Sequence, residues 1–288
     1  MAAAIGRYWS LLRETATQWS AHKSPTHGAA LAYYSVFSLG PLLVIAIAIA
    51  GWAFGDDAAR GGVTEQLKDL LGPAGAQAVA AMLAAASAPR KGLIAGLVGI
   101  ATLLIAATAV VRELKDAMNT IWEVDETGEG GVLSFAKSYL WSIAIVISVG
   151  FLLLVSLVIT AAIAAFGMQV RGLVPEGALH AIVLAISFVV TTGIFALMFR
   201  WLPDAAVRWK DVWLGAALTA VLFEAGKLAI GFYIGRLGLE STYGAAASLV
   251  VVLIWIYYNA QILLFGAEFT HVFARRWAAG ANASEPPP

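Results

Sequence analysis

The stretch GAAASLVVVLIWIYYNAQILLFGAEF, residues 244–269, decides the fold of this chain. Its only charged residue is Glu268, one position before its end. An α-helix rises about 1.5 Å per residue, so about 20 mainly apolar residues cross the roughly 30 Å hydrocarbon core of a bilayer. The stretch is long and apolar enough for this, and it is therefore predicted to be a transmembrane helix.

Five further stretches of the same kind precede it. They span residues 31–54, 92–111, 139–167, 178–199 and 212–235. Together the six segments predict an all-α, polytopic membrane protein: a bundle of six transmembrane helices with residues 1–276 as a single membrane domain. Residues 277–288 end in Glu285-Pro286-Pro287-Pro288 and are predicted to be a disordered tail.

The composition indicates that lipid is the main solvent of this chain. Of its 288 residues 60% are hydrophobic and 12% are charged, the mean hydropathy is +0.82, and 18 basic residues balance 18 acidic ones. Since soluble domains carry about 25% charged residues, these values exclude an ordinary cytosolic enzyme, a disordered chain and a basic nucleic-acid binder. The chain has no cysteine, and its four histidines show no metal-ligand spacing. We therefore expect no metal site and no cofactor.

Lysine and arginine set the predicted orientation, because cytoplasmic connections carry an excess of both. The connections on the side of the N-terminus contain eleven of them, and those on the other side contain six. Both termini are therefore predicted to be cytoplasmic. Tryptophans such as Trp52, Trp122, Trp201 and Trp213 lie at or near predicted span ends, where amphipathic rings settle at the headgroup level.

Two segments outside the spans are also predicted to be helical. Residues 4–20 form an amphipathic helix whose apolar residues recur every three or four positions: Ile5, Tyr8, Trp9, Leu12, Ala16 and Trp19. Such a helix either lies in the cytoplasmic membrane interface or packs against the spans. The connection 55–91 is predicted to hold short extracytoplasmic helices, with residues 74–88 external or re-entrant.

Polar residues inside the spans are the candidates for a substrate pathway. A charged side chain at the centre of a transmembrane helix costs about 2.5 to 3.5 kcal/mol on insertion scales, so it faces protein or water rather than lipid. Glu224 lies near the middle of the fifth span, and Lys227 follows three residues later on the same face. The pair either lines a polar cavity or forms a buried structural clamp.

The sixth span adds further polar groups to these candidates. Tyr257, Gln261 and Glu268 share one face of the predicted helix, and Asn259 lies on a neighbouring face. Amides within spans also join helices to one another, so a structural role for Asn259 and Gln261 is the alternative.

The first span contributes Tyr34, Ser38 and Pro41 as pathway candidates. Proline removes a backbone donor and disturbs the helix one turn earlier, which is tolerated where protein or a water-filled cavity satisfies the freed carbonyl. Arg112 and Arg200, at the predicted cytoplasmic ends of the second and fourth spans, are candidates for a cytoplasmic entrance.

Several of these residues belong to longer motifs, which occur in the following order. They are Ala30-Leu31-Ala32-Tyr33-Tyr34-Ser35-Val36-Phe37-Ser38-Leu39-Gly40-Pro41, Asn119-Thr120-Ile121-Trp122, Phe199-Arg200-Trp201-Leu202-Pro203-Asp204, Val212-Trp213-Leu214-Gly215-Ala216, Tyr243-Gly244-Ala245-Ala246, Trp255-Ile256-Tyr257-Tyr258-Asn259-Ala260-Gln261 and Gly266-Ala267-Glu268. In order and spacing, over roughly residues 10–276, they resemble the YihY/virulence factor BrkB family of bacterial inner-membrane proteins. Met118 departs from the family, which more often has leucine before the asparagine. The resemblance implies six helices in the cytoplasmic membrane.

The resemblance implies no single activity. Members of the family were once labelled ribonuclease BN, and others are linked to serum resistance or to the export of lipid A precursors. Metal-dependent RNA hydrolysis needs clustered histidine or carboxylate ligands, and RNA binding needs a basic surface. The scattered histidines and the acidic connection 112–138 fit neither requirement, so the sequence argues against a ribonuclease.

The polar stripe favours a transporter, flippase or exporter of an anionic amphipathic lipid or related envelope precursor, and not an enzyme. Lys227, with Arg112 or Arg200 at the entrance, would attract an anionic headgroup, and Glu224 is the candidate for proton coupling. A small-solute or ion transporter and a non-transporting scaffold in envelope assembly are the alternatives. The expected partners are membrane lipids and envelope-assembly proteins but no nucleic acid, and the sequence leaves a monomer and a homodimer open.

The predicted orientation can be tested directly, because the chain contains no native cysteine. A Ser10→Cys variant is expected to react with a membrane-impermeant maleimide only after the cells are opened. An Arg60→Cys variant, in the predicted external connection, is the control and is expected to react in intact cells. Labelling of position 10 from outside would show the predicted orientation to be wrong.

Overall fold

A computed structural model describes residues 2–38, 61, 80, 93–124, 176–237 and 247–282. Helices occupy most of them: α1 (Ala2–Ala21), a helix over residues 24–38, α4 (Leu93–Ile121), α6 (Glu176–Trp201), α7 (Trp209–Leu237) and α9 (Ala247–Asn282). These described residues contain no strand, which confirms the predicted all-α fold for this part of the chain.

Two of the described helices are long and apolar enough, by length and composition, to cross a membrane. They contain Leu184–Trp201 of α6 and Val250–Arg276 of α9, which overlap the fourth and sixth predicted spans. The third predicted span, most of the first and nearly all of the connection 55–91 lie outside the described residues. The count of six spans and the extracytoplasmic helices therefore stay predictions.

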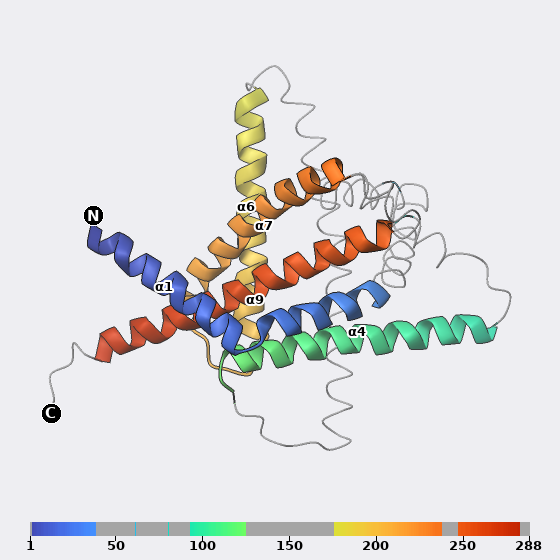
Figure 1. Ribbon diagram of the computed structural model, residues 1–288, viewed down its shortest axis with the longest axis horizontal. Coiled ribbons are helices and arrows are strands. Elements are labelled where there is room, and N and C mark those ends of the chain that lie inside the picture. Colours follow the sequence, from blue (N-terminus) through green and yellow to red (C-terminus); the bar gives the residue numbers. More distant parts are fainter. Residues whose placement is uncertain are drawn as a thin grey trace.

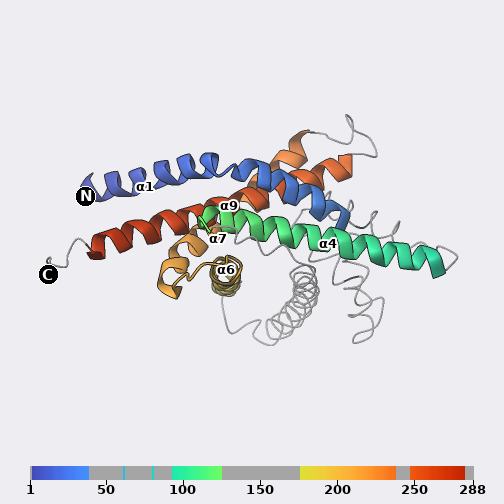
Figure 2. The same cartoon turned by 90° about the horizontal axis from the view of Figure 1, so that it is seen from below.

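Helix α9 is the central element of the described bundle (Figure 1). It contacts α1, α4, α6 and α7, and α6 also contacts α7. The start of α1 and the end of α9 lie at the same end of the molecule in both views (Figures 1 and 2). Because α9 touches four other helices, its residues meet groups from several distant parts of the sequence.

Two helices extend past the ends of their predicted spans. Helix α4 continues from Val111 to Ile121, and α9 continues from Phe269 to Asn282. The predicted disordered tail is therefore wrong for residues 277–282, where three alanines with strong helix propensity prolong α9. The remaining tail residues lie outside the described part of the chain.

A corner separates α1 from the helix over residues 24–38. Lys23 at this corner has a φ of 55°, in the left-handed region that often ends a helix. His27 N then donates to Lys23 O at 3.2 Å and begins the next helix. Pro25 fits there because residues in the first helical turn need no intrahelical donor. The first predicted span thus starts its helix at residue 24 rather than at Leu31.

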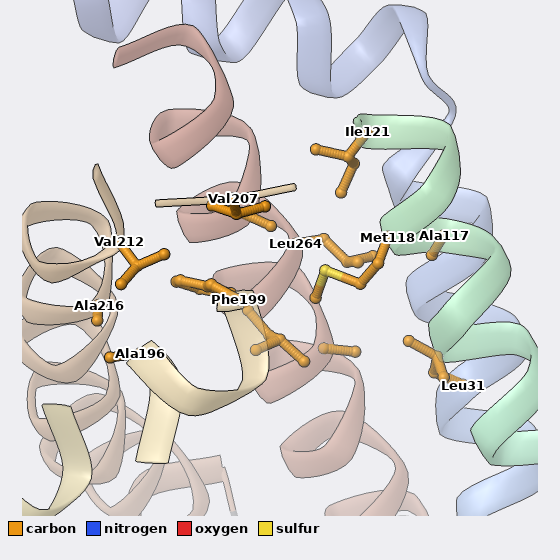
Figure 3. Close-up of a cluster of buried hydrophobic side chains, with 13 residues drawn as sticks. Leu31, Ala117, Met118, Ile121, Ala196, Phe199, Val207, Val212, Ala216 and Leu264 are labelled. Carbon is orange, nitrogen blue, oxygen red and sulfur yellow. The ribbon is translucent and has the colours of Figure 1, made fainter. Parts of the chain in front are cut away.

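The main buried core lies where the other helices meet α9. Figure 3 shows Met118, Phe199 and Leu264 pointing toward one another from α4, α6 and α9, and each of the three side chains is fully buried. Leu31 and Val212 bring the 24–38 helix and α7 into the same cluster. Large apolar groups in close contact contribute dispersion energy even where lipid removes the hydrophobic driving force.

Helices α7 and α9 approach each other closely through small residues. A methyl group at Gly215 would overlap Thr270, and one at Gly226 would overlap the Tyr258 ring. The Tyr258 hydroxyl donates to Leu222 O at 2.8 Å, a hydrogen bond between the two helices. Small residues at interfaces of this kind allow transmembrane helices to pack backbone against backbone.

The outer face of α6 is apolar and exposed within the described bundle. Its large exposed side chains are Ile182, Leu184, Ile186, Val189, Val190, Ile194 and Leu197. A contiguous apolar face of this kind is unfavourable in water and suits contact with lipid tails. At the end of this helix Trp201, Trp209 and Trp213 form an exposed aromatic group with neighbouring ring centroids 6.3 Å apart, typical of the headgroup level.

The close α7–α9 contact predicts the effect of adding a single methyl group. In Gly266→Ala the new methyl would overlap Thr219 and come within 3.1 Å of the Phe199 ring, so we expect a loss of stability of about 1 to 3 kcal/mol. Thermal unfolding of the detergent-solubilised protein measures this loss. Gly193→Ala is the matched control, because a methyl group on that glycine of α6 meets nothing within 4 Å. Equal melting temperatures for the two variants would contradict the described packing.

Candidate functional site

The predicted pair on α7 is present in the structure. Lys227 Nζ lies 2.7 Å from Glu224 Oε2 and 5.3 Å from the centroid of the Phe223 ring. The two side chains are partly exposed, 24% for Lys227 and 32% for Glu224, so the described helices do not enclose them. The second carboxylate oxygen, Glu224 Oε1, is buried and has no hydrogen-bond partner among the described residues.

The pathway candidates on the sixth span are divided among different surroundings. Asn259 Nδ2 donates to Trp255 O at 2.7 Å within α9, and Tyr257 is exposed. Gln261 Nε2 donates to Pro25 O at 3.3 Å, and its amide occupies the space that a side chain on Gly28 would need. For Gln261 the structure therefore gives the helix-joining contact that the sequence left as an alternative.

The first-span candidates make local contacts. The Tyr34 ring lies 5.6 Å from the Tyr33 ring in an edge-on arrangement. The Ser38 hydroxyl donates to Ser35 O at 3.0 Å, and Pro41 lies outside the described residues.

The two entrance candidates lie on separate helices. Arg112 is exposed on α4. Arg200 is partly buried on α6, and its Nε is buried without a hydrogen-bond partner in the described ranges.

A second polar site, which the sequence did not predict, lies where the corner after α1 meets α9. His22 Nδ1 is 2.8 Å from Glu268 Oε1, and Glu268 has no exposed surface. Ser24, also buried, lies beside the same carboxyl group. No sequence pattern relates positions 22 and 268, so the one available signal is that Glu268 shares a helix face with Gln261.

A second histidine–carboxylate pair lies one helical turn further along the chain. His27 Nδ1 is 2.7 Å from Glu113 Oε1 on α4, and both side chains are about a quarter exposed. The start of the 24–38 helix is therefore held to α9 through His22 and to α4 through His27. Both histidines had been considered isolated because their partners lie far away in the sequence.

Ionic contacts fix α1 along the outer part of α9. Arg275 Nη2 lies 2.6 Å from Glu14 Oε1, and Arg276 forms a second ion pair with the same carboxylate. Burial opposes ionisation of Glu14, but hydrogen bonds and the charges of the two arginines hold its pKa below its usual value. Arg276 Nη1 also donates to the Ser10 hydroxyl at 2.9 Å, so this arginine spans one turn of α1.

Two of the sequence motifs meet at the end of α4. Asn119 Nδ2 donates to Asp204 Oδ2 at 3.0 Å, and Asp204 N donates back to Asn119 Oδ1 at 2.9 Å. Lys115 Nζ lies 2.9 Å from the same carboxylate. These contacts clamp α4 to the connection between α6 and α7, which gives both motifs a structural role.

Metal binding has no support in this part of the chain. Within the described residues no group of three or more histidine, aspartate and glutamate side chains is placed to hold a metal ion. Each of the two histidines contacts its own carboxylate, and such a pair can exchange a proton.

The described elements are all helices, two of them are long and apolar enough to cross a membrane, and the exposed face of α6 suits lipid, as in an α-helical membrane protein. The chain belongs to the family described as Virulence factor BrkB, which it matches over residues 15–287. This confirms the family indicated by the sequence motifs.

Its relatives are bacterial proteins named UPF0761 membrane protein. The chain is 32% identical to one from Alkalilimnicola ehrlichii, covering 89% of this chain and 57% of that protein. It is 32% identical to one from Verminephrobacter eiseniae, with 84% and 57% covered, and 27% identical to one from Saccharophagus degradans, with 97% and 62% covered. The chain thus spans about three fifths of the length of these relatives. No solved structure matches it.

Removal of the Glu14 charge is expected to loosen α1 from α9. Glu14→Gln should weaken this contact by about 1 kcal/mol, after allowance for screening by water, and increase hydrogen exchange in α1. Since the pKa of Glu14 is lowered in the folded protein, its contribution is present above the unfolded pKa and is lost as the pH falls through the folded pKa. Wild type and variant should therefore converge in acid.

The matched control for this experiment is Arg13→Gln, which removes a charge from the exposed face of α1. We expect its hydrogen exchange to follow the wild type at every pH. A difference between Glu14→Gln and wild type that persisted at acid pH would contradict an ionic origin.

Proposed function

We propose that this protein moves an anionic amphipathic lipid, or a related envelope precursor, across the bacterial cytoplasmic membrane. The observation that carries the proposal is the partly exposed Glu224–Lys227 ion pair in the middle of a predicted transmembrane helix. In this proposal the protein acts as a transporter rather than an enzyme and uses no cofactor.

The position of the pair on α7 supports a polar route. Gly226 faces α9, and Glu224 lies two residues earlier, about 200° around the helix axis. The Glu224 side chain is therefore directed away from the α7–α9 contact, and Lys227, about 100° from Gly226, lies at its edge over the Phe223 ring. A lysine and a glutamate at mid-depth are stable only where water, protein or a polar headgroup meets them, since bare lipid tails would leave both charges unsolvated.

The chemistry of the pair suits a lipid substrate. An ammonium group attracts a phosphate or carboxylate headgroup, and Glu224 can take over that ammonium group when the headgroup leaves. The acyl chains would stay in the bilayer beside the apolar face of α6. This arrangement distinguishes a lipid transporter from a small-solute or ion transporter, which would enclose the same pair on all sides.

Helix α1 has an exposed side that suits a membrane interface. One side of this helix is buried in the bundle and carries Leu11 and Thr15. On the other side Trp9 is 70% exposed, and Leu12 and Ala16 are exposed beside it. An apolar stripe that no described helix covers suits the interface of a membrane. We propose that α1 binds α9 with one side and the cytoplasmic headgroup region with the other, so that both termini are cytoplasmic.

Transport is tested in liposomes of phosphatidylethanolamine and phosphatidylglycerol with the reconstituted full chain. Movement of headgroup-labelled phosphatidylglycerol between leaflets is expected for the wild type. The Glu224→Gln, Lys227→Met double variant is expected to slow it about tenfold or more, because the neutral side chains no longer bind an anionic headgroup.

Lys210→Met is the control, since it removes an exposed lysine at the start of the same helix. We expect it to transport at the wild-type rate. If the double variant moved lipid as fast as wild type, this stripe would not be the route. If the wild type moved a small anion but no lipid, the small-solute alternative would replace the lipid proposal.

A further inference from the structure

Glu268 is a fully buried carboxyl group whose one described hydrogen-bonding partner is a histidine. His22 Nδ1 lies 2.8 Å from its Oε1, while Oε2 is buried without a partner among the described residues. An ionised carboxylate with one unsatisfied oxygen is unfavourable in such surroundings, and a protonated one loses most of that penalty. The geometry therefore makes two protonation states of the pair accessible.

The two members of the pair differ in their access to water. Glu268 has no exposed surface, whereas the His22 side chain is 16% exposed at the corner after α1. Lys23, the next residue, is exposed at the same corner. A proton from solution can therefore reach the carboxyl group through the imidazole ring, on the side proposed to be cytoplasmic.

The charged and titratable groups around the pair come from three elements. The 24–38 helix presents Ser24, the end of α4 presents Glu123, and α9 itself presents His271 and Arg275. Arg275 Nη1 lies 3.9 Å from Glu123 Oε1, so these two charges largely offset each other. Phe199 of α6 and Thr219 of α7 lie against Gly266, two residues before Glu268, and neither titrates.

His271 is the remaining titratable group near the pair. Its ring lies 5.0 Å from the Trp122 ring, and its Nδ1 is buried without a hydrogen-bond partner in the described part of the chain. Within the described ranges the histidine that contacts Glu268 is His22, so the carboxyl group exchanges its proton through that ring.

We propose that the His22–Glu268 pair is a proton-binding site, loaded through His22, that controls how the start of the 24–38 helix binds α9. Before proton binding the pair consists of a neutral imidazole with its proton on Nδ1 and an ionised carboxylate. Hydronium from the solution gives a proton to Nε2, and the proton on Nδ1 passes to Glu268 Oε1. The products are water, a neutral imidazole with its proton on Nε2 and a neutral carboxylic acid, so the pair gains one proton and one positive charge.

The site is placed where proton binding can change helix contacts. Besides His22, the same segment binds α9 through Gln261, whose Nε2 donates to Pro25 O. When the carboxylate becomes a neutral carboxylic acid, its charge-assisted hydrogen bond to His22 is replaced by a weaker neutral one, so this corner is held less strongly to α9. If this change drives transport, which rests on the proposed function, then Glu268 is the proton-coupling residue. It takes the place of Glu224, the candidate from the sequence.

Infrared spectroscopy tests proton binding without any assumption about transport. In full-length protein in phosphatidylethanolamine and phosphatidylglycerol liposomes, we expect a carbonyl band of a protonated carboxyl group that appears and disappears with pH. The band should be missing in Glu268→Gln, and its midpoint should move by about one pH unit in His22→Asn. A band that persists in Glu268→Gln, or one that His22→Asn leaves in place, would overturn the proposal.

A matched control and a conservative variant complete this test. His27→Asn removes the other, more exposed histidine partner and is expected to leave the band unchanged. Glu268→Asp keeps a carboxyl group on a shorter side chain and is expected to keep the band with a shifted midpoint, even if Glu268→Gln fails to fold. If the band in Glu268→Asp had the same midpoint as in wild type, the band would belong to another carboxyl group, and the proposal for Glu268 would be wrong.

The same liposomes separate this proposal from the transport proposal. If the transport proposal and the proton-site proposal both hold, an imposed pH gradient accelerates lipid movement in wild type. In His22→Asn this acceleration is expected to be about tenfold smaller, and in His27→Asn it is expected to be unchanged. Absence of lipid movement at every pH, with the titrating band retained, would reject the transport proposal and support the proton site. Lipid movement that ignores the gradient, without a titrating band, would reject the proton site alone.

Discussion

Water is absent from the hydrocarbon core of a bilayer, so each backbone group there must find its partner within the protein. The described helices satisfy this demand internally, and side chains then decide which helices touch. In α7 and α9 small residues and threonines allow close approach, while Tyr258 donates to a backbone carbonyl of the facing helix. The arrangement of the other described helices follows from this contact, because α9 is the helix that they share.

The polar groups are distributed according to depth. At mid-depth the chain carries the Glu224–Lys227 pair, which sums to zero charge. Toward the proposed cytoplasmic end polar contacts are more numerous. They join His22 to Glu268, His27 to Glu113, and Glu14 to two arginines. Charges near the headgroups and water need less compensation than charges in lipid, so this end tolerates a polar network that the middle of the bundle would not.

Contacts between residues close in the sequence could be predicted, whereas contacts between residues far apart in the sequence could not. The Glu224–Lys227 pair could be predicted because three residues bring two side chains to one helix face. The His22–Glu268 pair could not, since its members are 246 residues apart and His22 belongs to none of the motifs. Gln261 was placed on the correct face of the sixth span, but its partner, Pro25 O, depends on the corner at Lys23. The end of α9 was placed too early because hydropathy marks where lipid contact stops and not where a helix stops.

Helix α9 has 36 residues, a length of about 54 Å at the rise of an α-helix, and contains no proline. It is therefore one uninterrupted helix that is longer than the hydrocarbon core of a bilayer. Its outer part carries Arg275 and Arg276, which grip α1, and its inner part carries Gly266 and Tyr258, which touch α7. The contact that holds α1 and the contact that holds α7 therefore lie on one uninterrupted helix, so the positions of α1 and α7 are coupled through α9.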